Sequence, residues 1–398
     1  MNRVLEDIRV LDFGRFIACP YCGMLLADMG AEVIRVERPG GEEDRTIGLL
    51  GPNGQNMSYP SYARNKKGIT LRLMNNEKGR EVLADLLQKT DVVIHNFTSK
   101  AAEMMGLGYE ALKAIKPDII LASISCFGSE GPYANRQGFD FIAQAMSGCL
   151  YLGGYSDKPP IRAFMNPMDF GTAIFAAFGT MLALRHRDKT GEGQIVDLAL
   201  LRTATSWNAP VIAEAEVLGR PRPIIGNRVA YMGPSDLFQC QDGHVFIATL
   251  MDTLWRRLAK AIGHEDLIDD PDLQNDYSRF ENRHKIDPLV AEWCSQRTVD
   301  EVLKELEKAR IPCGPCLGLD KVAHDPHIKE TNMIEYIDLE EPGLNNVPIC
   351  GIPIRMSKTP GKVVTRAPRV GEHNREIYQD LLGYSEEKIA KLKTDDVI

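Results

Sequence analysis

A single carboxylate stands directly before a long uncharged stretch of the chain. Asp169 lies in the segment PMDFGT at 167–172, and the residues from Phe170 to Leu184 are apolar or small and carry no charge. This pattern predicts a helix that packs on all sides, with Asp169 at or next to its N-cap. Unpaired amides and the positive end of the helix dipole favour an anion at that place. An ordinary helix cap explains this motif by itself, and a reactive carboxylate is the alternative interpretation.

Two C-x-x-C pairs also have residue types that perform chemistry, Cys19 with Cys22 and Cys313 with Cys316. A redox pair normally follows a strand and opens a helix, whereas Pro312 precedes the second pair. Four zinc thiolates from segments so far apart in sequence would lack the usual hairpin spacing. We therefore expect two turns that happen to carry cysteine, and no metal site.

Bulk composition limits the class of protein. The chain has 398 residues, 44% of them hydrophobic, and a formal net charge of −8. The length favours two domains, and the charge argues against nucleic acid or an anionic membrane as the main partner. The N-terminal segment contains acidic residues, and no apolar run reaches about 18 residues. Together with nine cysteines, these features predict a soluble cytoplasmic protein whose thiols are mostly buried.

Short apolar runs alternate with amphipathic stretches over the first 125 residues. Helices between β-branched runs are typical of β-α-β units, so we predict an α/β fold with a large doubly wound, Rossmann-like domain. Ligands of such sheets collect at the carboxyl ends of the strands, here at 14–19, 38–41, 96–100 and 125–128. No G-x-G-x-x-G follows the first strand, which argues against a nicotinamide dehydrogenase. The expected strands are 8–13, 31–36, 68–73, 91–97 and 119–125.

A smaller α+β domain is expected beyond the proline-bearing run GRPRPIIGNR at 219–228. A hairpin at 235–240 and 244–249 begins it, and helices follow near 252–262, 284–295 and 299–309. The residues after about 330 contain repeated prolines and indicate an extended return path. The predicted domains are 1–200, large and α/β; 201–228, a linker; 229–330, small; and 331–398, a return segment with a C-terminal helix that packs on the large domain.

Basic side chains gather near the expected ligand-binding edge of an otherwise acidic protein. Such a cluster favours a compact, multiply charged ligand such as a nucleotide or coenzyme A. A solvated surface is the alternative explanation for any one of these residues. The cluster comprises Arg15, Arg38, Arg64, Lys66, Lys67, Arg72 and Lys100.

Seven segments in order give the chain a family resemblance. It resembles the class III coenzyme A transferases, the family named for its carnitine and bile-acid members and including formyl-CoA transferases, from about residue 5 to about residue 386. The segments are LDFGRFIACPYCGMLLADMGAEVIRVERPGG, ARNKKGITLRL, LGYEALKAIKPDIILASISCFGSEGPYA, GFDFIAQAMSG, TGEGQIVDLAL, IPCGPC and GEHNREIYQDLLGYS.

The resemblance implies a nucleophilic Asp169 that carries first the acyl group and then CoA, through mixed-anhydride and thioester intermediates. It implies that Asp140 orients the nucleophile or the substrate, although an ordinary cap of the following helix also explains Asp140. CoA and acyl-CoA are then substrates, with no tightly bound cofactor. Amides of the helix N-terminus, Gly171 and Ser125–Gly128 are expected as oxyanion donors. The residues that match the family's CoA contacts are Phe16, Ile17, Ala18, Arg38, Leu71, Arg72, Asn96 and Phe97, and Lys100 is a substitute for a missing arginine.

Departures from the family pattern bear on the substrate and on the reaction. Ile17 replaces a glutamine of the oxalate-using members, and residues 248–251 replace their glycine-rich loop. Oxalate and formate are therefore poor candidates for the substrate. The size of Phe139, Ile17 and Met251 favours a larger or less polar acyl group. Racemases of similar sequence use a histidine in a G-H-D segment. Phe139 stands there and cannot exchange a proton.

Two further alternatives stay open: intramolecular CoA transfer and a non-catalytic CoA-binding subunit of a heteromeric transferase. The resemblance also implies an interlocked homodimer, with its active site between the large domain of one chain and the small domain of the other.

Overall fold

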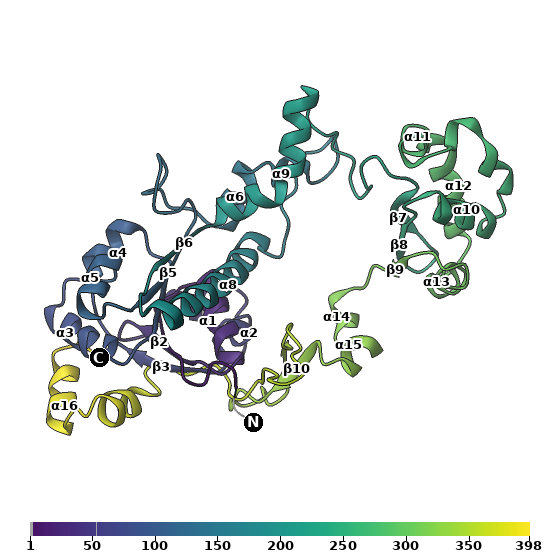
Figure 1. Cartoon of the computed structure of the whole chain (residues 1–398). Helices are drawn as coiled ribbons and strands as arrows, with labels where there is room; N and C mark the ends of the chain where they lie inside the picture. The colour runs from purple at the N-terminus through teal and green to yellow at the C-terminus, as the bar shows by residue number, and fades with distance from the viewer. Residues whose placement is uncertain (1–2, 53) are drawn as a thin grey trace. The chain divides into compact units, whose positions relative to one another are not determined.

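The computed structural model describes residues 3–52 and 54–398, and these form two compact units (Figure 1). The first unit comprises 1–149, 162–209 and 326–398, and the second comprises 150–161 and 210–325. Each unit has its own hydrophobic core.

A six-stranded parallel sheet forms the centre of the first unit, in the order β3-β2-β1-β4-β5-β6. This is the doubly wound order in which the direction of winding reverses between β1 and β4. The loops that follow these two strands therefore diverge and leave a crevice at the carboxyl edge of the sheet. The strands are β1 (Arg9–Asp12), β2 (Glu32–Glu37), β3 (Lys66–Thr70), β4 (Val92–His95), β5 (Ile120–Ser125) and β6 (Ile195–Ala199). The predicted doubly wound α/β fold is confirmed.

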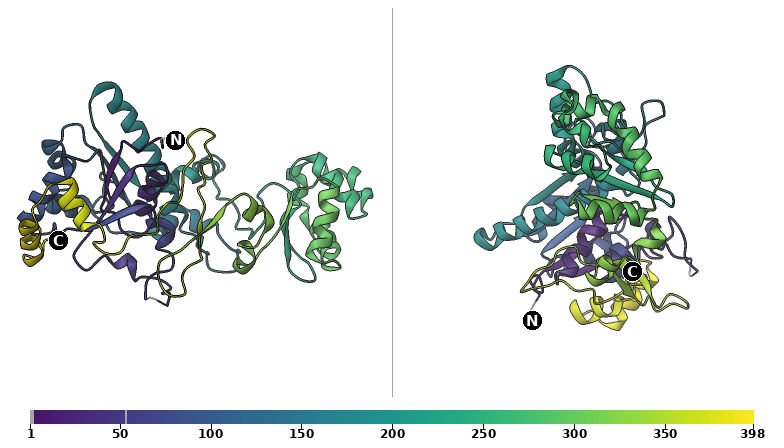
Figure 2. Two further views of the ribbon diagram at one scale, coloured as in Figure 1. Left: turned by 90° about the horizontal axis from the view of Figure 1, so that it is seen from below. Right: turned by 90° about the vertical axis from the view of Figure 1, so that its right-hand side faces the viewer.

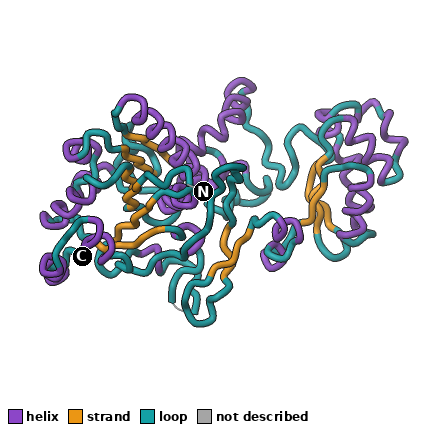
Figure 3. The backbone as a smooth tube through the Cα atoms, turned by 60° about the horizontal axis from the view of Figure 1, so that its bottom comes forward, coloured by secondary structure: helices purple, strands orange, loops and turns teal. Residues whose placement is uncertain are grey.

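Alternation along the strands explains why helices cover both faces of the sheet (Figure 3). In β1, Leu11 packs into one core and Val10 into the other, since successive side chains point to opposite faces. The first core lies under α3 (Glu77–Leu87), α4 (Ser99–Met105) and α5 (Tyr109–Ile115). The second lies under α1 (Ala18–Asp28) and α8 (Pro167–Thr190). The remaining elements before residue 220 are η1 (Glu43–Arg45), α2 (Pro60–Ala63), α6 (Asp140–Met146), α7 (Cys149–Leu152) and α9 (Leu200–Leu218).

The end of the chain packs on the first unit, where its helices lie beside α3 (Figures 1 and 2). Tyr378 is buried, and its hydroxyl donates to the carbonyl of Thr70 over 2.7 Å. Gly383 takes a positive φ of 70° and separates two helical segments, where the sequence predicted a single C-terminal helix. The two segments are a π-helical segment, Glu376–Leu381, and the helix α16 (Glu386–Thr394). Earlier in the chain lie the helix α15 (Pro326–Glu330) and the antiparallel strands β10 (Ile334–Ile337) and β11 (Val347–Cys350).

The second unit is the smaller α+β body that the sequence predicts. The expected hairpin is present as the antiparallel pair β7 (Ser235–Gln239) and β8 (His244–Ala248), joined by β9 (Cys313–Pro315). Three helices pack on this sheet through a shared core. The helices of this unit are α10 (Asp252–Ala261), α11 (Asp276–Glu281), α12 (Arg283–Ser295), α13 (Val299–Lys308) and α14 (Leu319–Val322), with short 3-10 turns at Glu265–Asp269 and Pro271–Leu273.

Helix α8 differs from its prediction at two points. It starts at Pro167, so Asp169 is the third helical residue and Asn166 occupies the N-cap. The helix also does not pack on all sides: its small residues face the core, while Ile174, Phe178 and Leu182 are more than half exposed. Among the described residues α8 alone is long and apolar enough to cross a membrane, but its inner face packs on the sheet and α1.

The expectation that both cysteine pairs lie in turns is wrong. Cys19 and Cys22 belong to α1, where burial raises the pKa of both thiols. Cys313 begins β9, and Cys316 directly follows that strand. Both pairs are therefore part of, or adjoin, regular elements, where the backbone hydrogen bonds of the helix or sheet rather than turn chemistry fix their conformation.

Candidate active site

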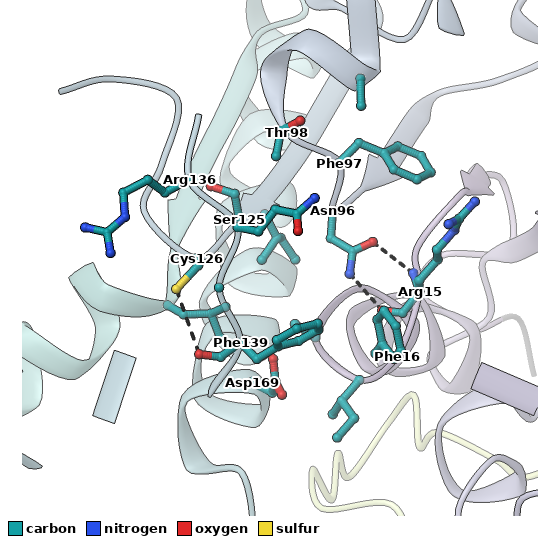
Figure 4. Close-up of a pocket in the computed structure, with 17 residues that line it drawn as sticks. Arg15, Phe16, Asn96, Phe97, Thr98, Ser125, Cys126, Arg136, Phe139 and Asp169 are labelled. Carbon is teal, nitrogen blue, oxygen red and sulfur yellow. Dashed lines mark hydrogen bonds between the residues drawn. The ribbon is translucent and has the colours of Figure 1, made fainter. Parts of the chain in front are cut away.

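Two cavities in the first unit meet at Asp169. The first, of about 300 Å³, lies at the carboxyl ends of β1, β4 and β5 (Figure 4). The second, of about 480 Å³, is lined by apolar side chains such as Ile47 and Phe141 and by the polar residues Asn56, Ser58 and Tyr62. Both cavities share four lining residues, Phe16, Ile17, Phe139 and Asp169.

The rings of Phe16 and Phe139 form part of the wall that both cavities share. Their centroids lie 5.6 Å apart in an edge-to-face arrangement. In Figure 4, Phe139 lies between Asp169 and the loop that carries Phe16. A molecule that spans the two cavities therefore passes this aromatic pair and the carboxylate of Asp169.

The carboxylate of Asp169 has few interactions that would stabilise its charge. No described residue donates a hydrogen bond to its oxygens, although its own backbone N–H is bonded. Burial, and secondarily the negative charge of Asp140, raise the pKa of Asp169 from 3.8 to about 7. A carboxylate that is poorly hydrated and unpaired is a stronger nucleophile than one in water, because attack does not require removal of a solvent shell.

Asp140 caps α8, although it belongs to α6. Its Oδ2 accepts hydrogen bonds from the amides of Met168 at 2.7 Å and Asp169 at 3.1 Å. Its Oδ1 accepts from Gln144 Nε2, and Gln144 in turn accepts from the amide of Ala163 at 2.9 Å. Asp140 is 1% exposed. The carboxylate that was predicted as a site residue or as a cap of its own helix thus holds the first turn of the helix that carries Asp169.

The expected oxyanion donors are mostly engaged. The amides of Met168 and Asp169 bond to Asp140, and the amide of Gly128 donates to Ser125 Oγ at 2.8 Å. The expectation of free donors at these amides is therefore wrong, because protein oxygens satisfy them first. The hydroxyl of Ser125 lines the first cavity, and no described acceptor takes its proton. This hydroxyl is therefore a donor that remains available in the first cavity.

Five of the predicted CoA contacts line the first cavity together with Asp169: Phe16, Ile17, Ala18, Asn96 and Phe97. Asn96 fixes the neighbouring loop, since its side chain accepts from the amide of Arg15 at 2.9 Å and donates to the Arg15 carbonyl at 2.7 Å (Figure 4).

The other four predicted contacts lie outside this cavity. Leu71 is a core residue, 4% exposed, and Arg72 bonds to Asp396 at 2.6 Å. Arg38 is half exposed and bonds to Glu43 at 2.8 Å, and Lys100 is exposed in the first turn of α4. The cavity thus contains the predicted loop residues but not these cations.

Most of the predicted basic cluster is paired within the protein. Arg64 and Lys66 are fully buried and bond to Asp28 and Asp12, each at 2.7 Å. Lys67 bonds to Glu32 at 2.5 Å. The interpretation of these three residues as ligand contacts is wrong, because neutralising carboxylates distant in sequence fold against them.

Arg136 is a lining residue that the sequence did not single out, and for Ser125 the sequence predicted the backbone amide as a donor rather than the hydroxyl. Arg136 lines the first cavity, and its guanidinium lies 4.7 Å from the ring centroid of Tyr133. The sequence offered one indication that Arg136 lies near the site, since it closely precedes the Gly138-Phe139-Asp140 segment. Its distance in sequence from the predicted basic cluster concealed its place in the cavity wall.

This geometry agrees with comparisons to known proteins. The sequence model of CoA-transferase family III matches residues 5–374. The chain belongs to CoA-transferase family III. Succinyl-CoA–D-citramalate CoA-transferase of Chloroflexus aurantiacus is 37% identical over 100% of this chain and 98% of its own length. Succinyl-CoA:mesaconate CoA-transferase of Haloarcula hispanica is 36% identical over 94% of this chain and 96% of its own.

A solved structure supports the same assignment for the fold. The crystal structure of a CAIB/BAIF family protein from Brucella suis has a TM-score of 0.84 and 32% identity, and the match covers 96% of this chain and 100% of that one. The family III transferase described here is therefore an enzyme that moves CoA between an acyl-CoA and a carboxylic acid. The resemblance drawn from the sequence is confirmed.

Proposed function

We propose that this family III transferase uses Asp169 as a covalent carrier. A carboxylate oxygen of Asp169 attacks the thioester carbon of the donor, and the CoA thiolate leaves, giving a mixed anhydride. The thiolate attacks the aspartyl carbonyl and expels the donor acid, which leaves an aspartyl-CoA thioester. The acceptor carboxylate attacks this thioester and releases the thiolate, which then attacks the acceptor carbonyl of the second anhydride and restores Asp169. Each step forms one bond and breaks one, so no net proton is transferred.

The unpaired Asp169 carboxylate at the junction of the two cavities carries this proposal. The first cavity receives the thiol end of CoA along Phe16–Ala18 and Asn96, and the second receives the acyl group and the acid. The Ser125 hydroxyl donates to the oxyanion on the CoA side, and Asp140 positions Asp169 through the amides of α8. Exclusion of water by the aromatic pair protects the anhydrides from hydrolysis.

Trapping tests the carrier role directly. The pure protein is mixed with succinyl-CoA, the donor that the names of its relatives suggest, and then with hydroxylamine. An aspartyl thioester gives a hydroxamate, so peptide mass spectrometry should place the modification on Asp169. The Asp169→Asn protein serves as a control and should give no adduct. Modification elsewhere, or none with an active enzyme, would refute the carrier role.

The same experiment separates the remaining alternatives. A non-catalytic CoA-binding subunit would bind CoA without forming an adduct. A racemase would exchange the α-hydrogen of the acyl group with solvent deuterium without an acceptor acid, but Phe139 fills the position where similar racemases carry their histidine. Intramolecular transfer would give an adduct and a rearranged product without any added acid.

The second cavity supports a substrate class. No lysine or arginine is among the described residues that line it, whereas Ile47, Phe139 and Phe141 provide apolar surface and Ser58 and Tyr62 provide hydroxyls. We propose an acyl group larger than formyl or oxalyl, with a hydroxyl or ester-like oxygen that these groups can bind. A panel of acyl-CoA donors and carboxylic acids, with mass detection of new thioesters, tests this choice.

The exposed stripe on α8 supports a homodimer. Ile174, Phe178 and Leu182 recur every four residues and so lie on one side of the helix, where they are 55%, 61% and 55% exposed. We propose that a second copy covers this stripe and that the active protein is a cytoplasmic homodimer; the nine free thiols are compatible with a reducing compartment. Phe178→Glu should yield monomers in light scattering, whereas Glu103→Gln on the exposed surface of α4 should not.

A further inference from the structure

The loop Gly14–Phe16 that follows β1 is held by side chains rather than by other backbone. Its three consecutive amides donate to Asp12 Oδ1 at 2.8 Å, Asn96 Oδ1 at 2.9 Å and Asp44 Oδ2 at 3.2 Å, in chain order. These acceptors come from three segments: β1, the end of β4, and η1. Because each segment fixes one peptide unit, the loop has little freedom to change its path.

The carbonyl groups of the loop are fixed in the same manner. Gly14 O accepts from Arg35 Nη1 at 2.7 Å, and Arg15 O accepts from Asn96 Nδ2 at 2.7 Å. Arg35 also donates through Nη2 to both carboxylate oxygens of Asp44, at 2.9 and 2.7 Å. Arg35 and Asp44 thus form one unit that holds a carbonyl at residue 14 and an amide at residue 16.

Phe16 needs such support because its backbone is strained. Its φ of 63° lies in the left-handed region, which a bulky residue rarely adopts and which destabilises the backbone unless neighbouring groups enforce it. In this conformation the ring reaches Phe139 and lines both cavities. Relaxation of φ to a negative value would turn the ring away and open the shared wall.

The Arg35–Asp44 pair is costly to bury, which argues that it serves more than packing. Arg35 is 0% and Asp44 2% exposed, and removal of two charges from water offsets much of their attraction. Arg35 lines neither cavity. Asp44 lines the second cavity but not the first, and its carboxylate oxygens accept from Arg35 and from the amide of Phe16. Neither residue lines the first cavity, so an effect of the pair on CoA binding passes through the loop.

We propose that Asp44, held by Arg35, is a positioning residue that keeps Phe16 in its left-handed conformation and so sets the wall between the CoA cavity and the acyl cavity. The proposal rests on the proposed use of these cavities. It assigns the buried pair a role in CoA binding, at a cavity that neither residue lines, and the pair exerts this role through the backbone of residues 14–16.

Asp44→Asn tests the proposal, with Asp28→Asn as a matched control. Asp28 and Arg64 form a second buried pair, with contacts of 3.1 and 2.7 Å, that touches neither cavity nor the loop. Both substitutions should lower the melting temperature. Only Asp44→Asn should increase hydrogen exchange in a peptide that contains 14–16, and only it should weaken CoA binding in calorimetry, by about tenfold, as expected for one lost hydrogen bond to a charged group.

Phe16→Gly provides the rescue that distinguishes positioning from general loss of stability. Glycine adopts a positive φ without strain, so Asp44→Asn should weaken CoA binding much less in the Phe16→Gly protein than in the unaltered chain. Arg35→Lys, which cannot hold Asp44 and Gly14 O in the same fork geometry, should act in the same direction if Asp44→Asn fails to fold.

Equal effects of Asp44→Asn and Asp28→Asn on CoA affinity, additive effects in the Phe16→Gly background, or unchanged exchange at 14–16 would each overturn the inference. Failure of the proposed function has a different signature: the unaltered protein would then show no trapped adduct at Asp169, whereas the exchange difference between the two variants would still be measured.

Discussion

The raised pKa of Asp169 predicts that its replacement by asparagine stabilises the protein while it abolishes transfer. In the folded state the pKa rises from 3.8 to about 7, so ionisation at neutral or higher pH opposes folding. Below pH 3.8 the group is protonated in both states and contributes nothing; above about pH 7 the full penalty applies. Asparagine removes this penalty and loses no side-chain hydrogen bond, since no described residue donates to the carboxylate.

The magnitude follows from the shift of about three pH units, which at about 1.36 kcal/mol per unit gives an upper limit of about 4 kcal/mol. Asp169 is only partly buried, and solvent screening reduces this to about 1–2 kcal/mol. For a domain of this size the expected increase in Tm is about 2–8 °C at pH 8, and roughly a third of that at pH 5.

Differential scanning fluorimetry of both proteins at pH 8 and pH 5 measures this difference. Asp188→Asn, which neutralises an exposed carboxylate near the other end of α8, is the control and should change Tm little at either pH. A decrease in Tm for Asp169→Asn, or an increase that is no greater at pH 8 than at pH 5, would refute the view that Asp169 is a destabilised anion.

The other predictions concern pH, packing and assembly. Because the proposed mechanism requires the ionised form of Asp169, the rate of adduct formation should rise with pH through about 7 and fall about tenfold per pH unit below it; rapid-quench kinetics measure the inflection. Asp140→Asn removes a negative charge that raises this pKa, so the inflection should move to lower pH; an unmoved inflection would contradict the assigned cause. Gly171→Ala should destabilise the protein by about 1–3 kcal/mol in urea unfolding, since a Cβ there would lie 2.2 Å from the Trp207 ring, and Trp207→Ala in the same chain should relieve most of this loss. Phe178→Glu should lower the apparent mass in solution, and an unchanged mass would argue against the α8 stripe as an interface.

Local patterns in the sequence determined most of the secondary structure and drew attention to Asp169, to which the family resemblance then assigned the proposed role of nucleophile. Strands such as β1 and β2 were predictable because short β-branched runs bounded by turn residues favour strands. The hairpin β7–β8 was predictable from its turn residues. Asp169 could be singled out because a lone carboxylate before an uncharged helix is unusual. The sequence alone also shows Phe139 at the position where similar racemases carry a histidine, which argues against racemase activity.

Tertiary structure alone decided which groups neutralise one another. Arg64 and Lys66 look like ligand contacts in the sequence, but Asp28 and Asp12 fold against them, and Asp140 caps a helix that begins 27 residues later. Whether a charge is paired or available depends on contacts between residues distant in the chain, and no local periodicity encodes them. The same holds for the exposed face of α8 and for the two cavities at Asp169, since both are properties of how elements pack against each other.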